Sequence, residues 1–145
     1  MSDSDLKQLN FPQTISDSSI KGIILVEICD KVVCDALSQF NLPIVSVDMP
    51  NVPFEELNGI DVVTMESKKN LKKIINQLIE KGAESFGFVG DLYSPNVSRG
   101  FQERYNALSE CLAEHQLPLN QKNCLLHQTP EVFGIFRPQL IICKL

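Results

Sequence analysis

Five polar side chains in this sequence are suited to binding a small molecule. Arg104 presents a rigid fork of N–H donors that can hold sugar hydroxyls, a carboxylate or a phosphate. The other four lie at or just after the ends of predicted strands, where parallel sheets bind ligands, and they are Asp48, Glu66, Asp91 and Tyr93. Carboxylates accept hydrogen bonds from hydroxyls, and a tyrosine ring offers a flat face to a sugar. Together these residues predict recognition of a polar ligand.

Four of these residues also have a purely structural interpretation. Arg104 can be a surface arginine in water, and Tyr93 can simply pack against its neighbours, as loop tyrosines usually do. A carboxylate at Glu66 can stabilise the N-terminus of the following helix, and both interpretations of Glu66 stay open. For Asp48 the turn after its strand is the favoured role.

Catalytic and metal-binding patterns find little support in the sequence. The two histidines, His115 and His127, stand in no arrangement with Cys, Ser and Asp that suggests a triad. No P-loop and no G-x-G-x-x-G motif is present. The cysteines are odd in number and never spaced as C-x-x-C, which favours reduced and mostly buried thiols: Cys29, Cys34, Cys111, Cys124 and Cys143. We therefore expect no enzyme activity, no cofactor and no bound metal.

Length, composition and charge indicate one globular domain. The chain has 145 residues, of which 43% are hydrophobic and 21% charged, and this is enough to bury a substantial core. Its formal net charge of −5 argues against direct binding of nucleic acid, which requires a basic face. The polar, acidic N-terminus is no secretory signal, and no apolar stretch is long enough to span a bilayer. We expect a cytoplasmic location and no membrane contact.

Strands and helices are predicted to alternate along the chain. Apolar runs predict strands at 22–28, 43–48, 60–65 and 85–89, and two further short strands at 122–127 and 139–144. Asp30 and Ser67 are predicted to cap two helices, and a third helix runs from about Arg99 to His115. Because a strand is followed by a helix three times, the pattern predicts an α/β fold with a doubly wound parallel sheet and helices on both faces.

Two segments are predicted to face solvent. Residues 1–19 hold few apolar positions and predict a flexible N-terminal arm. The second helix carries a cluster of lysines, Lys68, Lys69, Lys72 and Lys73. These lysines are predicted to project mostly into water rather than to bind nucleic acid, because acidic residues outnumber basic ones overall.

The order and spacing of several motifs resemble the effector domain of the LacI/GalR transcription regulators. KGIILV at 21–26 is similar to the family's DGIIL strand, LPIVSVDMP at 42–50 to LPVVLVDRP, NQLIEKGAESFGFVGD at 76–91 to HLIELGHRRIAFIGG, and RPQLIIC at 137–143 to RPTAIIC. Arg104 begins a segment that looks like R-x-x-G-F/Y, although Ala107 and Leu108 replace the usual glycine and aromatic residue. Glu66 and Ser67 stand where the family usually has Asp and Asn.

The resemblance implies a fragment of a periplasmic-binding-protein-like (type I) fold. Residues 20–82 would form part of the N-terminal effector subdomain and residues 83–145 part of the C-terminal one. The family's helix-turn-helix, the first strand-helix-strand-helix of its effector domain and its last strands have no counterpart in this sequence. We expect exposed sheet edges as a result, and a homodimer as a way to cover them.

The resemblance also implies a function. In the family the arginine that matches Arg104 points into the cleft and contacts the effector, and ligand binding changes the angle between subdomains and hence the affinity for DNA. We therefore expect a region that binds a small-molecule effector of the sugar class, with DNA contacted only through a helix-turn-helix that this chain lacks. Two alternatives stay open: a small flavodoxin-like enzyme, and a truncated regulator that acts as a dimerisation module.

Overall fold

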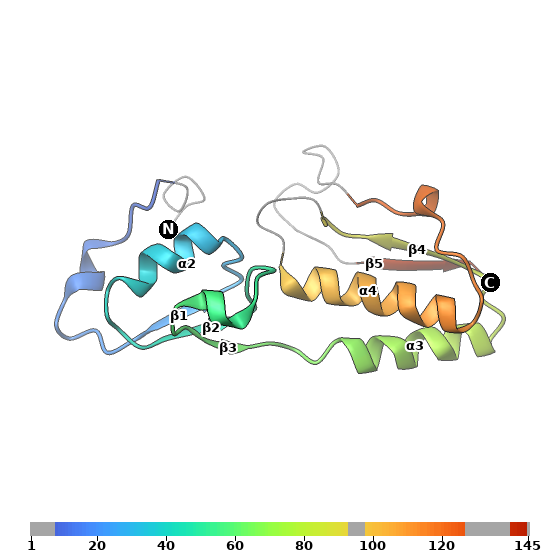
Figure 1. Cartoon of the computed structure of the whole chain (residues 1–145), viewed down its shortest axis with the longest axis horizontal. Coiled ribbons are helices and arrows are strands. Elements are labelled where there is room, and N and C mark those ends of the chain that lie inside the picture. Colours follow the sequence, from blue (N-terminus) through green and yellow to red (C-terminus); the bar gives the residue numbers. More distant parts are fainter. Residues whose placement is uncertain (1–7, 93–97, 127–139, 145) are drawn as a thin grey trace. The chain divides into compact units, whose positions relative to one another are not determined.

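The computed structural model describes residues 8–92, 98–126 and 140–144, the last segment as a strand without its side chains. The chain divides into two compact units, Met1–Met65 and Glu66–Leu145. Figure 1 shows a short sheet and one α-helix in the first unit, and two longer helices beside a pair of strands in the second.

Three parallel strands form the sheet of the first unit. They pair in the order β1-β2-β3, and their bounds are Ile23–Val26 for β1, Ile44–Val47 for β2 and Asp61–Val63 for β3. A short 3-10 helix, η2 (Phe54–Leu57), lies in the connection between β2 and β3. The structure therefore confirms the α/β class and these three predicted strands, each with tighter bounds.

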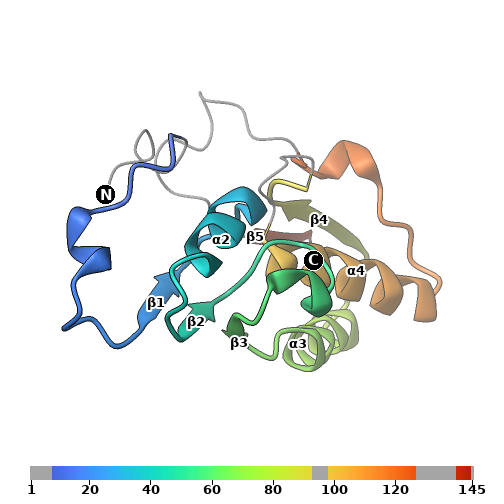
Figure 2. The same ribbon diagram turned by 60° about the vertical axis from the view of Figure 1, so that its left-hand side comes forward.

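A single α-helix covers one face of this sheet. α2 (Lys31–Ser38) begins after Asp30, whose carboxylate accepts N–H bonds from Val32 at 2.8 Å and Val33 at 3.4 Å, as its predicted capping role requires. Figure 2 shows α2 on one side of the three strands. The core between them consists of Leu25, Val33, Cys34, Leu37, Ile44, Met49, Leu57 and Ile60.

The opposite face of the sheet departs from the predicted doubly wound arrangement. Strand residues that alternate with the core positions, such as Ile24 and Val26, are exposed. Within the described part of the first unit, the prediction of helices on both faces is therefore not met.

The described part of the N-terminal segment contacts the core of the first unit. It contains a 3-10 helix, η1 (Gln13–Ser16), and both Phe11 and Ile15 pack against the core of the first unit. The ring of Phe11 meets that of Phe40 edge-on, with 5.7 Å between the centroids. The few apolar side chains of this segment thus find partners in the core, and the flexibility of the arm over 1–19 stays a prediction. Residues 1–7 lie outside the described residues.

The second unit contains two helices and an antiparallel pair of strands. Its elements are α3 (Lys68–Glu80), β4 (Ser85–Val89), α4 (Arg99–Glu114), η3 (Gln121–Asn123) and β5 (Leu140–Lys144). β4 pairs with β5 antiparallel, which corrects the expectation that this strand joins a parallel sheet. Within the strand predicted at 122–127, the described residues 122–126 form the end of η3 and one parallel bridge between Leu125 and Val89 instead. The Asn120 side chain caps η3 by accepting a hydrogen bond from the Lys122 N–H at 3.0 Å, which favours the turn over a strand.

Gly82 ends α3 and turns the chain into β4. Its φ of +94° lies in the left-handed region that glycine adopts without strain. The Gly82 N–H donates to the Ile79 carbonyl at 2.9 Å, and the Ala83 N–H donates to the Leu78 carbonyl at 3.0 Å. This pair of bonds is the Schellman pattern, and it confirms the helix end predicted at Lys81 and Gly82.

Helices α3 and α4 lie side by side and share one core with β4 (Figure 1). The buried residues of this core are Ile75, Ala83, Phe86, Phe88, Leu108, Cys111, Leu112 and Leu126. The boundary between the two compact units of this chain falls between residues 65 and 66, before α3. The division into effector subdomains between residues 82 and 83 stays a prediction. An amphipathic stripe predicts that a helix is buried on one side, but not which neighbour buries it.

The described cysteines are free thiols. Cys29, Cys34 and Cys111 are buried and Cys124 is partly exposed, as the sequence predicts, while the side chain of Cys143 lies outside the described residues. Burial, helped by nearby Asp35 and Asp30, raises the pKa of Cys34 to about 11. This thiol therefore stays protonated at neutral pH and serves as core packing.

The longest of the described helices, α4, has 16 residues. None of the helices in the described ranges combines the length and the apolar character that crossing a bilayer requires.

A substitution at Gly87 tests the packing of η3 on β4. A methyl group at this position would collide with the Asn123 backbone carbonyl, whereas one at Gly100 would lie 3.4 Å from the nearest atom, the Ser98 hydroxyl. We expect Gly87→Ala to lower the free energy of unfolding by about 1–3 kcal/mol. The matched control Gly100→Ala should be neutral or stabilising by up to about 1 kcal/mol, since alanine favours a helix. Urea unfolding followed by circular dichroism gives both values, and equal stability of the two variants would contradict this packing.

Candidate functional site

Two strands of the first unit end in an unusual backbone conformation. Glu27 follows β1 with φ +56°, and Asp48 follows β2 with φ +69°. Each still extends the sheet, because the Glu27 N–H donates to the Val47 carbonyl and the Asp48 N–H to the Val63 carbonyl, both at 3.0 Å. A left-handed conformation is rare for residues other than glycine and is found preferentially at functional sites. These two carboxylates mark the carboxyl edge of the sheet, where α/β proteins bind ligands.

Asp48 holds the turn that follows β2. Its carboxylate accepts a hydrogen bond from the Met49 N–H at 2.8 Å. The buried Ser46 hydroxyl donates to the Asp48 carbonyl at 2.6 Å. These contacts support the turn role that the sequence favoured, and a direct contact of Asp48 with a ligand stays a prediction.

Glu66 caps α3. Its carboxylate accepts a hydrogen bond from the Lys69 N–H at 2.6 Å, and the Asn70 side-chain amide donates to the Glu66 carbonyl at 3.3 Å. The predicted cap, Ser67, makes no such bond, and its buried hydroxyl has no hydrogen-bond partner. The longer side chain of Glu66 therefore takes over the capping position, since a carboxylate at a helix N-terminus satisfies a backbone N–H and the helix dipole. Its part in ligand binding stays a prediction.

Two buried polar residues lie between β4 and α4 in the second unit. Asp91, two residues beyond β4, is 7% exposed, and Ser98 is also buried. The Ser98 hydroxyl accepts a hydrogen bond from the Gly100 N–H at 3.1 Å and caps α4. Tyr93, the other residue of this loop that the sequence predicts to contact a ligand, lies outside the described residues.

The side chain of Arg104 runs back along α4 toward its first turn. A methyl group at Gly100 would lie 3.6 and 3.7 Å from the two terminal nitrogens of the guanidinium, so the cationic group lies beside that residue. Arg104 is only partly exposed. Long side chains on helices generally point toward the N-terminus in this way. The structure therefore places the positive charge near the start of α4 rather than extended into bulk water.

Part of the predicted set gathers at one end of the second unit. β4 and α4 run in opposite directions, so the carboxyl end of β4 and the first turn of α4 lie at the same end of the unit (Figure 1). Asp91 follows the former, and the Arg104 guanidinium lies beside the latter. A carboxylate and a guanidinium in this arrangement offer acceptors and donors to a polar ligand. Glu66 is also in this unit, whereas Asp48 is in the first.

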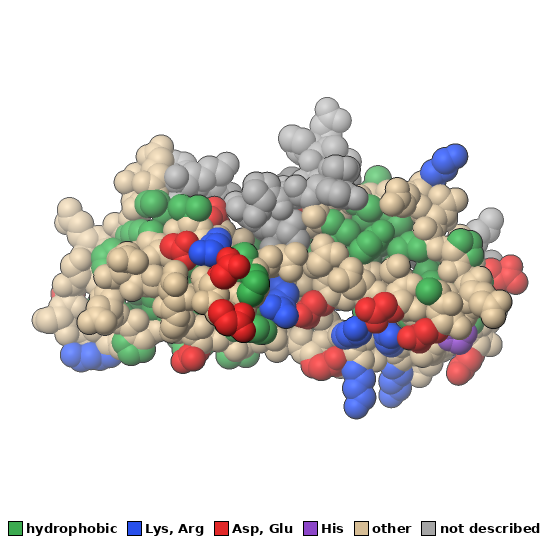
Figure 3. Space-filling model, viewed as in Figure 1, with side chains coloured by type: hydrophobic (Ala, Val, Ile, Leu, Met, Phe, Trp, Pro, Cys, Tyr) green, Lys and Arg blue, Asp and Glu red, His purple; other side chains and the backbone are tan. Residues whose placement is uncertain are grey.

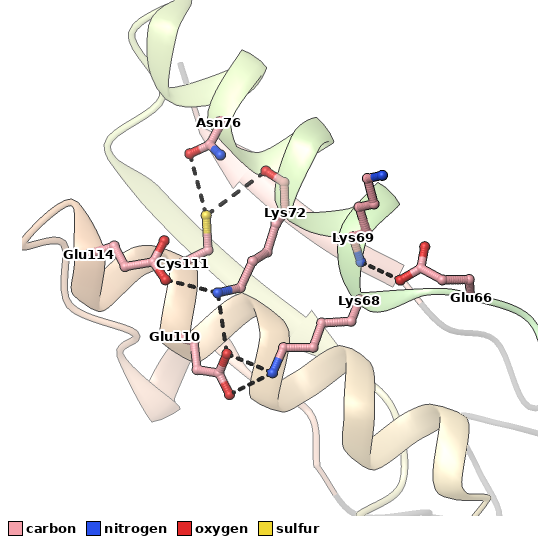
Figure 4. A network of polar contacts seen from close by, with 8 residues as sticks. All are labelled: Glu66, Lys68, Lys69, Lys72, Asn76, Glu110, Cys111 and Glu114. Carbon is pink, nitrogen blue, oxygen red and sulfur yellow. Dashed lines mark hydrogen bonds and ion pairs between the residues drawn. The ribbon is translucent and has the colours of Figure 1, made fainter.

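A network of charges between α3 and α4 was not predicted. Lys68 pairs with Glu110 at 3.0 Å, and Lys72 pairs with Glu110 at 3.2 Å and with Glu114 at 2.8 Å (Figure 4). Lysine and carboxylate groups gather over these two helices on the surface shown in Figure 3. Two of the lysines expected in water are therefore paired. Lys68 and Lys72 are four residues apart, and so are Glu110 and Glu114. This matched spacing along two helices is the feature of the sequence that could have predicted the pairing.

A second set of polar contacts extends this network along the two helices. The Asn76 amide oxygen lies 3.5 Å from the Cys111 sulfur and 2.6 Å from the His115 Nε2 (Figure 4 shows the first of these contacts). Among the residues that the structure describes, this network included, no group of three or more His, Cys, Asp and Glu side chains is placed to hold a metal ion.

Comparison with known proteins gives one local match. The chain is 36% identical over 64 residues to catabolite control protein A of Staphylococcus xylosus. The match spans 44% of this chain and 18% of that relative. No family model matches the chain, and no solved structure matches it. The likeness gives a suggestive link to the LacI family of regulators, and the α/β fold with its parallel sheet is compatible with that link.

Removal of the Glu66 carboxylate should loosen the start of α3. We expect Glu66→Ala to lower the stability of the second unit by about 1 kcal/mol and to speed hydrogen exchange at the Lys69 amide, which loses its acceptor. Glu84→Ala removes another exposed carboxylate of the same unit and serves as the control. Unchanged exchange at Lys69 in Glu66→Ala would show that the cap does not form.

The network between α3 and α4 predicts the titration of Glu110. Hydrogen bonds from Lys68 and Lys72 hold the pKa of this carboxyl below its ordinary value of 4.5. The contribution of these hydrogen bonds to the stability of the folded state is therefore fully present above pH 4.5. It is lost as the pH falls through the lowered pKa of Glu110. An NMR titration should give a higher Glu110 pKa in Lys72→Met and an unchanged one in Lys73→Met, whose lysine is exposed on the same helix. Equal values in the two variants would contradict the pairing.

Proposed function

We propose that this chain is the effector-binding region of a LacI/GalR-type transcription regulator. The observation that carries the proposal is the 36% identity to catabolite control protein A over 64 residues. That relative is named as a control protein, and we infer a regulatory role for this chain from the sequence similarity alone. The motif order set out in the sequence analysis and the parallel sheet of the first unit support the same assignment, with a type I periplasmic-binding-protein-like fold.

The ligand we propose is a small molecule rich in hydroxyl groups, such as a sugar. Arg104 would donate to its hydroxyls and Asp91 would accept from them. The position of the guanidinium beside Gly100, at the start of α4, supports this role for Arg104. Glu66 and Asp48 already serve a helix cap and a turn, so we give them the smaller share of binding.

DNA would be contacted by another part of the regulator. The formal net charge of −5 argues against phosphate binding by this chain, because such binding requires a basic face. Effector binding would favour one conformation of the intact regulator, and this shift in population would change its affinity for DNA. Such a protein would act in the cytoplasm.

A second function, a dimerisation module, is favoured by one observation. Apolar residues of the sheet in the first unit are exposed, Ile24 by 74% of its surface and Val63 by 57%. Exposed apolar surface of this kind commonly marks a protein contact. Such a module would pair with a related regulator and need bind no sugar.

Thermal unfolding with a panel of sugars and nucleosides separates these functions. A ligand that binds only the folded state raises the midpoint temperature of unfolding. Once the ligand concentration exceeds the dissociation constant, the stabilisation grows with the logarithm of that concentration. We expect at least one sugar to raise the midpoint and nucleosides to leave it unchanged. A flat response across the panel would contradict effector binding, and together with the mass of a dimer it would favour the dimerisation module.

Variants at two arginines of α4 test the binding residue. Arg104→Lys keeps the charge but loses the planar fork, so we expect it to weaken binding of the active sugar by about tenfold or more. Arg99→Lys is the matched control, because Arg99 lies on the same helix and pairs with Glu103 at 2.9 Å. Each ligand-induced shift is measured against the same variant without ligand, which removes effects on stability. Equal loss of binding in the two variants would exclude a specific role for Arg104.

A further inference from the structure

Gly100 stands in the first turn of α4 without the usual structural reasons for a glycine. Its φ is not in the left-handed region, which among the described glycines holds only Gly59 and Gly82. A methyl group on its Cα would also fit, because the nearest atom would lie 3.4 Å away, whereas one at Gly87 would collide with the Asn123 carbonyl. Glycine is a poor helix former, so its presence here calls for another explanation.

The guanidinium of Arg104 lies in the space that a side chain at Gly100 would occupy. Its two terminal nitrogens would be 3.6 and 3.7 Å from a methyl group at this position. Residues four apart are neighbours on the surface of a helix, and long side chains point toward the helix N-terminus. The neighbour three residues before Arg104 is Phe101, which is buried in the core. The space beside Gly100 is therefore where this side chain can fold back at the surface.

The dipole of α4 does not attract the guanidinium to this place. The first turn of a helix carries partial positive charge, which is unfavourable for a cation. The Ser98 hydroxyl, which caps α4, would lie 3.4 Å from the same methyl group, so the cap and the Arg104 guanidinium both border Gly100. A side chain larger than a methyl group at this position would compete with both of them for space.

We propose that Gly100 is a positioning residue of the ligand site, because its missing side chain lets the Arg104 guanidinium lie at the start of α4. The inference rests on the proposed function, in which Arg104 donates hydrogen bonds to a ligand rich in hydroxyl groups. Arginine has many rotamers, so its donors can reach very different points. With glycine at this position the donors stay close to the helix, and a larger residue would turn them outward. The size of residue 100 thereby determines which ligands the site accepts.

Gly100→Val tests the positioning without any ligand. Valine has two γ carbons and one strongly preferred rotamer in a helix, so it cannot turn away from the guanidinium. In NMR spectra of the labelled full chain, the Arg104 guanidinium protons should show a nuclear Overhauser effect to the Hα protons of Gly100. Gly100→Val should shift the Arg104 Nε–Hε signal, and Gly100→Ala should shift it less. Arg104→Lys lacks this signal and thereby identifies it.

Binding of D-glucose, whose substituents are hydroxyl groups, is the second measurement. We expect Gly100→Val to weaken binding by about tenfold or more, as Arg104→Lys does. In the double variant the loss should stay close to that of Arg104→Lys alone, because both changes remove the same interaction. The control is Gln102→Val, which adds the same side chain two residues away from Arg104, where it does not face the arginine. Each dissociation constant is compared only between variants that circular dichroism shows to be folded.

The two measurements separate this proposal from the proposed function. If D-glucose binds to none of the chains, the result counts against the sugar ligand, and the Arg104 signal alone then upholds or overturns the positioning. An Arg104 signal that stays in place in Gly100→Val would overturn the proposal. So would a shifted signal with unchanged affinity for D-glucose, or equal weakening by Gly100→Val and Gln102→Val.

Discussion

The packing of α4 against β4 is the interaction on which the candidate site depends. Leu108 and Leu112 are fully buried in a core with Phe88, and the rings of Phe88 and Tyr105 meet edge-on with 5.3 Å between their centroids. These contacts fix the rotation of α4 about its own axis, because turning the helix would expose the apolar stripe. Arg104 stands next to that stripe, so the same packing determines where its guanidinium lies. The hydrophobic core thereby positions the charge.

Several carboxylates at the ends of strands and helices serve as helix caps or hold turns. Asp30 and Glu66 accept backbone N–H bonds at the starts of α2 and α3, and Asp48 does so in the turn after β2. Each of these carboxylates satisfies a donor that would otherwise lack a partner. Asp91 is buried beyond β4, and in the proposed site it would bind a polar ligand together with Arg104. The surface that remains most exposed and apolar is on the sheet of the first unit.

Local signals in the sequence predicted most elements, and contacts between elements were the harder part. The strands at Ile23–Val26 and Ser85–Val89 and the helix cap at Asp30 follow from apolar runs and one capping carboxylate, which are properties of a few neighbouring residues. Three features depend instead on residues far away in the chain: the packing of α3 against α4, the antiparallel direction of β5, and the contact of Phe11 with the core of the first unit. Among the site residues, the sequence identified Asp91 and Arg104 as polar positions near the end of a strand and the start of a helix. It could not tell that Glu66, rather than Ser67, would cap α3, because both can do so.

The most direct test of the central claim is an NMR titration of the labelled chain with the sugar that stabilises it most. If Arg104 and Asp91 form the binding site, the backbone amide signals of residues 90–92 and 98–104 should shift with ligand concentration and reach saturation together. Signals of η3, which packs against β4 at Gly87 and not at its carboxyl end, should stay in place. Shifts confined to η3, or no saturable shift at residues 90–92 and 98–104, would contradict the account.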